Sequence, residues 1–244
     1  DVKKARATFV ALLAAEGADP AATLRASRAL LDIYDPAREG AAVAEALERI
    51  VRLEPDDDLR QETAERLAAI YEGSDALRPK AIGAWEALLE TRGRRRALEA
   101  LIPLYEQAGR TVELARALDG LAALVDGPGH ARELLLRAAQ VYGEAGDTVA
   151  AASTYRALVQ RFGATRELLD LWMPLLEAGK QWDDLATALA EHARLVPPAE
   201  RPGVYNRLGQ LALARLRNVT LAVDSFRRCL ELAPDDKAAR SALE

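Results

Sequence analysis

The chain has 244 residues, half of them apolar and 29% charged, which is enough to bury a sizeable core. Its net charge of -5 gives no overall attraction to a phosphate backbone, so the composition argues against general nucleic-acid binding. The single cysteine, Cys229, excludes an internal disulfide, and no apolar run reaches the roughly 20 residues that a membrane-spanning helix needs.

One sequence pattern recurs six times: a pair of apolar residues followed, four positions after its first member, by an anchor residue. The anchors are Tyr34, Tyr71, Tyr105, Tyr142, Leu175 and Ala212. Successive anchors are 37, 34, 37, 33 and 37 residues apart. A period in this range is typical of one supersecondary unit copied in tandem, so the sequence predicts a solenoid of stacked repeats.

In chain order, the predicted elements begin with a helix from Lys4 to Ala15, which has Ala5 and Phe9 at the positions of the second helix of a repeat. Six repeats of two helices, helix A and helix B, follow it. The leading helix and the six pairs make about thirteen helices, and residues 236–244 then look like the first turns of another helix A. Both ends look cut inside a longer array, so we expect the chain to be a piece of a larger protein.

Helix A of each repeat carries the apolar pair and the anchor. The first five pairs are Leu30/Leu31, Leu67/Ala68, Leu101/Ile102, Ala138/Ala139 and Leu171/Trp172. Gly109, Gly146 and Gly179 each lie four residues after an anchor. A left-handed helix end requires a residue without Cβ there, so these glycines predict where helix A stops.

Helix B opens with a small residue and has a large one three or four positions later. The small residues are Ala44, Ala81, Ala115 and Ala151, and the large ones are Leu47, Trp85, Leu118 and Tyr155. In the fifth repeat we assign Leu185 and Leu189 to these positions. Residues three and four apart share one helix face, so the small residue lets helix A approach while the large one fills the gap against the next repeat.

The sixth repeat has the most complete motif, and it resembles the tetratricopeptide repeat (TPR). The residues that match the family pattern, in order, are Tyr205, Leu208, Gly209, Ala222, Phe226, Cys229 and Pro234. Ala212 stands where the family has a tyrosine, and the turn after it contains one extra residue. The resemblance implies an all-α, right-handed superhelical solenoid of antiparallel helix pairs, with about six repeats and a partial repeat at each end, similar to bacterial TPR arrays.

Two joints between repeats are longer than the others, at residues 126–130 and 196–203. Their prolines and glycines end one helix and delay the next. Neither joint is long or polar enough for a flexible linker. We therefore expect residues 1–244 to form a single solenoid domain.

In TPR proteins helix A lines the concave groove, and its outward positions contact the ligand. Transferred to this sequence, the partner-binding positions are Arg25, Arg28, Asp32, Glu62, Glu65, Arg96, Glu99, Glu133, Leu136, Gln140, Arg166, Leu169, Met173, Asn206 and Gln210. The first half of this groove mixes charges of both signs, and the second half is more apolar, with Leu176 and Leu213 near it. The apolar strip is either a contact surface or, if the register is slightly different, part of the packing between helices.

Pro103 and Pro174 both fall inside predicted A helices. A proline in a helix interior removes a hydrogen bond and kinks the helix, which would widen the groove. The alternative, which we favour, is that each lies within a turn of a frayed helix start.

The sequence contains no phosphate-binding loop, nucleophile elbow, dinucleotide fingerprint or paired-carboxylate motif. His130 and His192 lack the neighbouring cysteine that zinc spacing requires. We therefore predict that the chain is not an enzyme and holds no cofactor or metal.

The predicted function is a protein–protein interaction scaffold that binds a peptide or helix of an unidentified partner in the groove. The family's carboxylate clamp needs several lysines and asparagines, and only Asn206 is present among the groove asparagines, so that mode is not expected. Two alternatives stay open: the array is a regulatory or oligomerising arm of a larger, enzymatic polypeptide, or it self-associates through its ends.

The remaining expectations concern environment and other partners. Nucleic-acid reading by helical repeats needs a basic groove, and this groove contains several glutamates. We expect no nucleic-acid partner and no membrane insertion. We expect the bacterial cytoplasm as compartment, with the periplasm as the alternative.

Overall fold

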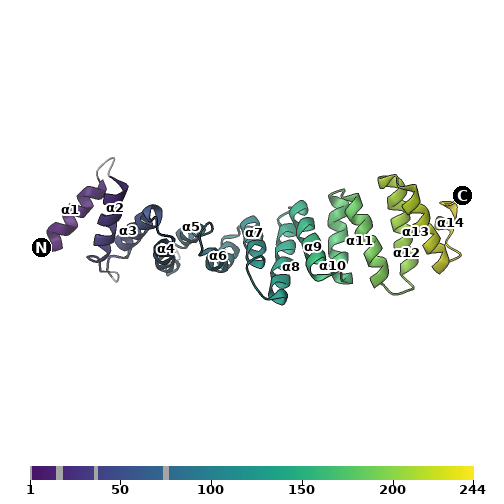
Figure 1. The fold of residues 1–244 in the computed structure, drawn as a ribbon, viewed down its shortest axis with the longest axis horizontal. Helices are drawn as coiled ribbons and strands as arrows, with labels where there is room; N and C mark the ends of the chain where they lie inside the picture. Colours follow the sequence, from purple (N-terminus) through teal and green to yellow (C-terminus); the bar gives the residue numbers. More distant parts are fainter. Residues whose placement is uncertain (1, 15–18, 36–37, 74–76) are drawn as a thin grey trace. The chain divides into compact units, whose positions relative to one another are not determined.

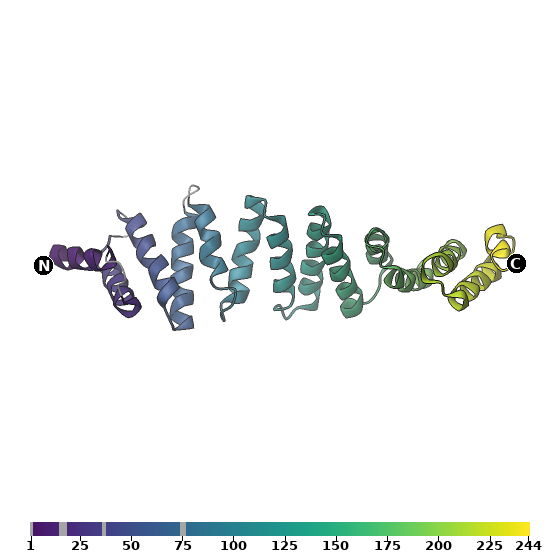
Figure 2. The ribbon, with the colours of Figure 1, turned by 90° about the horizontal axis from the view of Figure 1, so that it is seen from above.

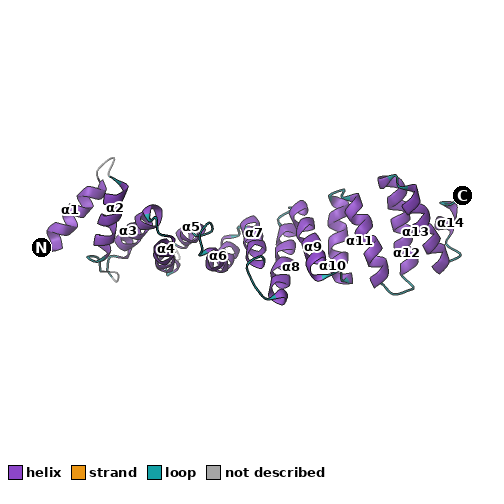
Figure 3. Ribbon diagram, viewed as in Figure 1, coloured by secondary structure: helices purple, strands orange, loops and turns teal. Residues whose placement is uncertain are grey.

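The computed structural model describes residues 2–14, 19–35, 38–73 and 77–244. Within these ranges the chain forms fourteen α-helices and one π-helical turn, joined by loops and without a strand (Figure 3). The fold is therefore all-α in the part of the chain that the structure describes, as the sequence predicts, and the fourteenth helix is the partial helix A expected at residues 236–244. The chain divides into two compact units, residues 1–124 and 125–244, and each is described by itself. The single domain stays a prediction.

The first compact unit holds seven helices, each of which packs against the next in chain order (Figures 1 and 2). They are α1 (Val2–Ala14), α2 (Pro20–Leu31), α3 (Gly40–Leu53), α4 (Asp57–Glu72), α5 (Arg78–Glu86), α6 (Arg94–Ala108) and α7 (Thr111–Ala122). The predicted A helices of the first three repeats are α2, α4 and α6, and their B partners are α3, α5 and α7. The last residue predicted for the first helix, Ala15, lies outside the described residues.

The second compact unit repeats this order of packing (Figure 1). Its elements are α8 (Pro128–Glu144), α9 (Thr148–Phe162), α10 (Arg166–Ala178), α11 (Trp182–Leu195), α12 (Arg201–Leu211), the π-helical turn η1 (Ala212–Leu216), α13 (Val219–Leu232) and α14 (Lys237–Ser241). The last three repeats are α8 with α9, α10 with α11, and α12 with α13. The short α14 begins the partial helix A expected after them.

The small and large positions of helix B form the core, as predicted. The small residues Ala81, Ala115 and Ala151 are fully buried. Of the large residues, Leu118 is fully buried and Tyr155 is 3% exposed. Because alanine is small, helix A can approach helix B closely at these positions. Burial of the alternating small and large side chains removes apolar surface from water, which is the main stabilising contribution in such stacks.

Two A helices end as their glycines predict. Gly109 and Gly146 have φ angles of 66° and 77°, in the left-handed region. After α6, the amide of Arg110 donates to the carbonyl of Tyr105 at 2.9 Å, and after α8 the amide of Asp147 donates to Tyr142 at 2.9 Å. This is the bond pattern of a Schellman helix end, in which the left-handed residue is usually glycine.

The fifth repeat departs from the predicted register by one residue. Gly179 has an ordinary φ of -79°, and the left-handed residue is Lys180, with φ 53°. The amide of Gln181 donates to the carbonyl of Leu176 at 2.8 Å, which is the same helix-end bond as in α6. The anchor of this repeat is therefore Leu176, 34 residues after Tyr142, rather than Leu175.

The corrected register also changes the core of this repeat. The apolar pair is Trp172/Met173, because Leu171 is 46% exposed while both members of that pair are buried. In α11 the small residue is Ala186, and Leu189 is the large residue three positions later, both buried. The fifth repeat is thus regular.

The extra residue predicted in the sixth repeat is taken up by η1. The amide of Asn218 donates to the carbonyl of Ala212 at 2.9 Å, and Arg217 is left-handed with φ 53°. A single π-helical turn accommodates one additional residue while the flanking helix keeps its register.

The two interior prolines do not lie at frayed helix starts, so the prediction favoured for them from the sequence is wrong. Pro103 is the tenth residue of α6, and Pro174 is the ninth of α10. The carbonyl groups that lose their hydrogen-bond donors belong to Glu99 and Asp170, which are both exposed residues. Water can satisfy a carbonyl on an exposed face, and this lowers the cost of an interior proline.

Candidate functional site

The structure brings three of the predicted groove residues together between α4 and α6, the A helices of the second and third repeats. A pocket of about 240 Å³ lies there, lined by Asp58, Gln61, Glu62, Glu65 and Arg96. We call the outward surface of α4 and α6 at these residues the helix-A face. Both helices that contribute lining residues to this pocket are A helices.

The charge of this pocket is predominantly negative. Arg96 pairs with Glu65 at 3.1 Å, and Nε2 of Gln61 donates to the same carboxylate at 3.0 Å. The carboxylates of Asp58 and Glu62 have no ion pair or side-chain hydrogen bond with any residue that the structure describes. Two acidic groups are therefore available to a ligand here.

The three predicted positions on α2 do not line the pocket between α4 and α6. Arg25 and Asp32 are exposed, whereas Arg28 forms an ion pair with the buried carboxylate of Glu54. Arg60 donates to the backbone carbonyl of Glu54 at 2.6 and 2.9 Å. Arg28 thus helps to hold the joint between α3 and α4, because a buried carboxylate requires a compensating charge.

The predicted residues of α6 and α8 are accessible. Glu99 is exposed and pairs with Arg95 at 3.1 Å. On α8, Glu133 and Gln140 are exposed and Leu136 is half-buried. These residues stay candidates for partner contact.

On α10 the apolar part of the predicted groove is wrong. Leu169 is fully buried and Met173 is 5% exposed, and Leu176 is also fully buried. They form core contacts because the true register lies one residue later than predicted. In that register the outward residues of α10 are Glu167, Asp170 and Pro174, all exposed.

The polar residues around α10 and α12 are engaged within the chain. Arg166 pairs with Glu200 at 2.9 Å, and Oδ1 of Asp170 lies 3.0 Å from Nε2 of His192. The amide group of Asn206 donates to Asp236 at 3.2 Å, and Gln210 donates to Asn206 at 2.9 Å.

Asp236 connects three elements at the end of the chain. It accepts from the amide of Ala239 at 2.9 Å, which caps α14, and from Asn206 of α12 and the thiol of Cys229 of α13. The backbone bond from Ala239 is the main reason why the pKa of Asp236 is below its usual value. Burial, followed by the negative charge of Asp236, raises the pKa of Cys229 to about 11, so this thiol is a protonated core group at neutral pH.

A second pocket, of about 290 Å³, lies among α10, α11, α12 and η1. Arg207 pairs with Glu177 at 2.9 Å on its edge, and the guanidinium of Arg215 lies 5.1 Å from the centre of the Trp182 ring. The predicted groove residue Gln210 also lines this pocket.

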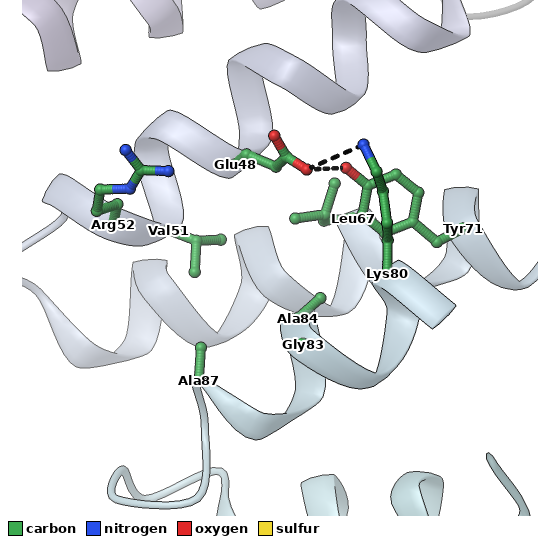
Figure 4. Close-up of a pocket in the computed structure, with 9 residues that line it drawn as sticks. All are labelled: Glu48, Val51, Arg52, Leu67, Tyr71, Lys80, Gly83, Ala84 and Ala87. Atoms are coloured by element: carbon green, nitrogen blue, oxygen red, sulfur yellow. Dashed lines mark hydrogen bonds and ion pairs between the residues drawn. The ribbon is translucent and has the colours of Figure 1, made fainter. Parts of the chain in front are cut away.

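A third cavity was not predicted from the sequence. It measures about 490 Å³ and lies among α3, α4 and α5 (Figure 4). Its lining residues are Glu48, Val51, Arg52, Leu67, Tyr71, Lys80, Gly83, Ala84 and Ala87. One feature of the sequence points to this cavity, namely the small residues in and just after helix B of the second repeat. These residues have too little volume to fill the space between neighbouring helices.

The anchor tyrosine at this cavity is held in place. The hydroxyl of Tyr71 donates to the carboxylate of Glu48, and the ammonium group of Lys80 lies 3.8 Å from the same carboxylate (Figure 4). Burial, followed by the hydrogen bond to Glu48, raises the pKa of Tyr71, so the phenol stays protonated over the physiological range.

The next repeat has a related but smaller cavity, of about 260 Å³, at α6 and α7 and the segment before them. Its anchor, Tyr105, donates to Glu86 at 2.9 Å, and Arg110 lies 4.9 Å from the ring centre. The same contact thus occurs in two successive repeats. In each, the anchor tyrosine donates to a glutamate of the preceding helix B and lies near a cation.

The described residues contain neither a cluster of metal ligands nor a helix suited to a membrane. Among these residues no group of three or more His, Cys, Asp or Glu side chains could hold a metal ion. In the same ranges no helix is both long enough and apolar enough to cross a membrane.

Comparison with known proteins gives one match to a family. Residues 133–165, from α8 to the start of the fifth repeat, match the profile of the tetratricopeptide repeat. No curated protein matches the chain significantly.

Several solved structures are similar to the chain. The TPR protein YrrB, described as having an unusual peptide-binding site, is 15% identical, with 82% of this chain and 98% of that chain covered and a TM-score of 0.36. The C-terminal part of a TPR repeat-containing protein from Cytophaga hutchinsonii is 12% identical, with 100% and 95% covered and a TM-score of 0.35. PilF of Pseudomonas aeruginosa is 12% identical, with 98% and 97% covered and a TM-score of 0.33.

The family match falls on a helix pair that recurs, with the same helix ends and the same buried small residues, in the repeats before and after it. Residues 133–165 are thus similar to one tetratricopeptide repeat, and the neighbouring helix pairs share its plan.

Proposed function

We propose that this chain is a non-enzymatic protein-interaction scaffold whose helix-A face binds an extended segment or a helix of a partner protein. The single observation that carries the proposal is the pocket between α4 and α6, which presents the unpaired carboxylates of Asp58 and Glu62. Stacked helical repeats generally use the surface formed by successive equivalent helices for recognition.

The size of the pocket favours a side chain as its occupant. Its volume of about 240 Å³ is below the roughly 300–1,000 Å³ typical of small-molecule sites. A lysine or arginine side chain of a partner would fit the charge of the pocket, because it could pair with the two free carboxylates while Glu65 stays paired with Arg96.

Charge reversal tests this proposal. Twelve-residue fluorescent peptides with lysine at every third or fourth position would be titrated with the wild-type chain and with the Asp58→Lys/Glu62→Lys variant, using fluorescence anisotropy. We expect at least a tenfold loss of affinity in the variant, and weaker binding to the wild type as salt is raised.

A matched control is Glu231→Lys. Glu231 is an exposed glutamate of α13, distant in sequence from the pocket. Equal affinity of wild type and the double variant for the basic peptides, or an equal loss in Glu231→Lys, would remove the helix-A face from the proposal.

A further inference from the structure

The cavity among α3, α4 and α5 lies on the opposite side of α4 from the helix-A face. Leu67 and Tyr71 of α4 line the cavity, whereas Glu62 and Glu65 line the acidic pocket. Glu65 and Leu67 are two positions apart, about 200° around the helix axis, so they point to opposite sides. The cavity is therefore a separate feature, bounded by two B helices.

The cavity exists because helix B of the second repeat lacks side-chain volume. One repeat spacing of 34 residues further on, Leu118 and Leu121 of α7 are both buried at the positions equivalent to Ala84 and Ala87. A Cβ added to Gly83 would have no atom within 4 Å. Two leucine side chains are thus replaced by methyl groups, and open space remains.

The inner surface is apolar and its geometry is set before any ligand arrives. Val51, Leu67 and Ala84 lie around the cavity, and the Tyr71 ring is fixed by its bond to Glu48 (Figure 4). The volume of about 490 Å³ is within the range that encloses a bulky ligand group. A preformed apolar cavity can bury a large side chain with little ordering cost.

The charge available at the edge of this cavity is positive. The carboxylate of Glu48 is occupied by the hydroxyl of Tyr71 and by Lys80. Arg52 lines the cavity and has no ion pair or side-chain hydrogen bond with any described residue. An anionic group beside an apolar side chain would therefore complement this edge, since a guanidinium binds carboxylates well.

We propose that this cavity binds a peptide segment in which a bulky apolar side chain is adjacent to aspartate or glutamate. The apolar side chain fills the space above Leu67 and Ala84, and the carboxylate pairs with Arg52. The smaller cavity of the next repeat is less suited to this ligand, because Glu90 and Glu113 line it together with Arg94 and Arg116 and balance their charge. The site is thus specific to the second repeat, and its ligand is opposite in charge to that of the helix-A face.

The test uses two pools of fluorescent twelve-residue peptides. One pool has Leu, Phe or Trp followed by Asp or Glu at its centre, and the other has lysine in place of the acid. We expect saturable binding of the acidic pool to the wild-type chain, at least tenfold tighter than that of the lysine pool. Gly83→Leu, which fills the cavity, and Arg52→Glu should each weaken binding at least tenfold.

Matched controls separate this site from folding defects and from the proposed groove. Gly143→Leu introduces the same side chain at another helical glycine whose Cβ would meet no atom within 4 Å, and Arg66→Glu reverses an exposed arginine that does not line the cavity. Both should bind as the wild type does, and so should Asp58→Lys/Glu62→Lys.

Three results would overturn the proposal: no saturable binding of the acidic pool, equal binding of the two pools, or full affinity in Gly83→Leu with its helical circular dichroism intact.

Discussion

The hairpins α6–α7 and α10–α11 have the same backbone plan with different side chains. Positions 71 residues apart correspond, so that Tyr105 matches Leu176 and Gly109 matches Lys180. Each helix A ends with the same pair of hydrogen bonds: Gly109 to Glu106 and Arg110 to Tyr105, against Lys180 to Glu177 and Gln181 to Leu176. The repeat geometry therefore does not depend on the tyrosine and the glycine.

What the two hairpins share is a buried apolar contact. Tyr105 is 4% exposed and Leu176 is fully buried, and the partners Ala115 and Ala186 of helix B are also buried. The tyrosine adds a hydrogen bond to Glu86, and the glycine avoids strain at a positive φ, so both features add stability to a geometry that packing alone establishes.

The largest effect should come from the anchor of the fifth repeat. Leu176→Ala should reduce the free energy of unfolding by about 2–5 kcal/mol, because it leaves a cavity at a fully buried site. Leu175→Ala, at a half-buried neighbour, should cost less than half as much. Urea denaturation followed by circular dichroism measures both. A larger loss for Leu175→Ala would restore the register predicted from the sequence.

An exchange of the left-handed residues should have the next largest effect. Lys180→Gly should stabilise the chain and Gly109→Lys should destabilise it, each by roughly 1 kcal/mol, because a side chain at positive φ is strained. The shift in the thermal unfolding midpoint would show the two opposite signs. The same sign for both substitutions would contradict the equivalence of these helix ends.

The hydroxyl of the tyrosine anchor should contribute somewhat less. Tyr105→Phe removes the 2.9 Å bond to Glu86 and should reduce the free energy of unfolding by about 0.5–1.5 kcal/mol. Combination with Glu86→Gln in a double-mutant cycle isolates the coupling between the two side chains. Full additivity would show that the hydroxyl of Tyr105 and the carboxylate of Glu86 are not coupled.

The smallest effect concerns pH. In α7, the hydrogen bond from Arg110 is the main cause of a lowered pKa for Glu113. A carboxyl group whose folded pKa is depressed stabilises the protein above its unfolded pKa, and this contribution is lost as pH falls through the folded pKa. Glu113→Gln should therefore slightly flatten the acid side of the stability curve below about pH 4.5. An unchanged acid limb in pH-dependent urea melts would exclude this contribution.

Sequence reasoning worked best where a repeat carries polar or glycine markers. In the third and fourth repeats, Tyr105, Gly109, Tyr142 and Gly146 locate both the core and the helix ends. In the fifth repeat, the leucines at 175 and 176 are equally good anchors by composition, and Gly179 indicates the wrong one. Only the burial of Leu176 and the backbone of Lys180 distinguish them.

The candidate sites were accessible to prediction to different degrees. Glu62, Glu65 and Arg96 could be placed together because each occupies the outward face of its own helix, which follows from helical periodicity. The cavity beside Gly83 could not, since its volume depends on side chains of three helices and on how far those helices approach one another.

The sequence alone determines that this protein is built of helix pairs in tandem, because the spacing of apolar residues within each helix and of the anchors between repeats is local information. Only the tertiary structure decides the register of the fifth repeat, the π-helical turn in the sixth and the cavity in the second. The register and the cavity depend on which side chains are covered by their neighbours, and the π-helical turn depends on how the backbone takes up one extra residue between two packed helices. All three are properties of the packed chain.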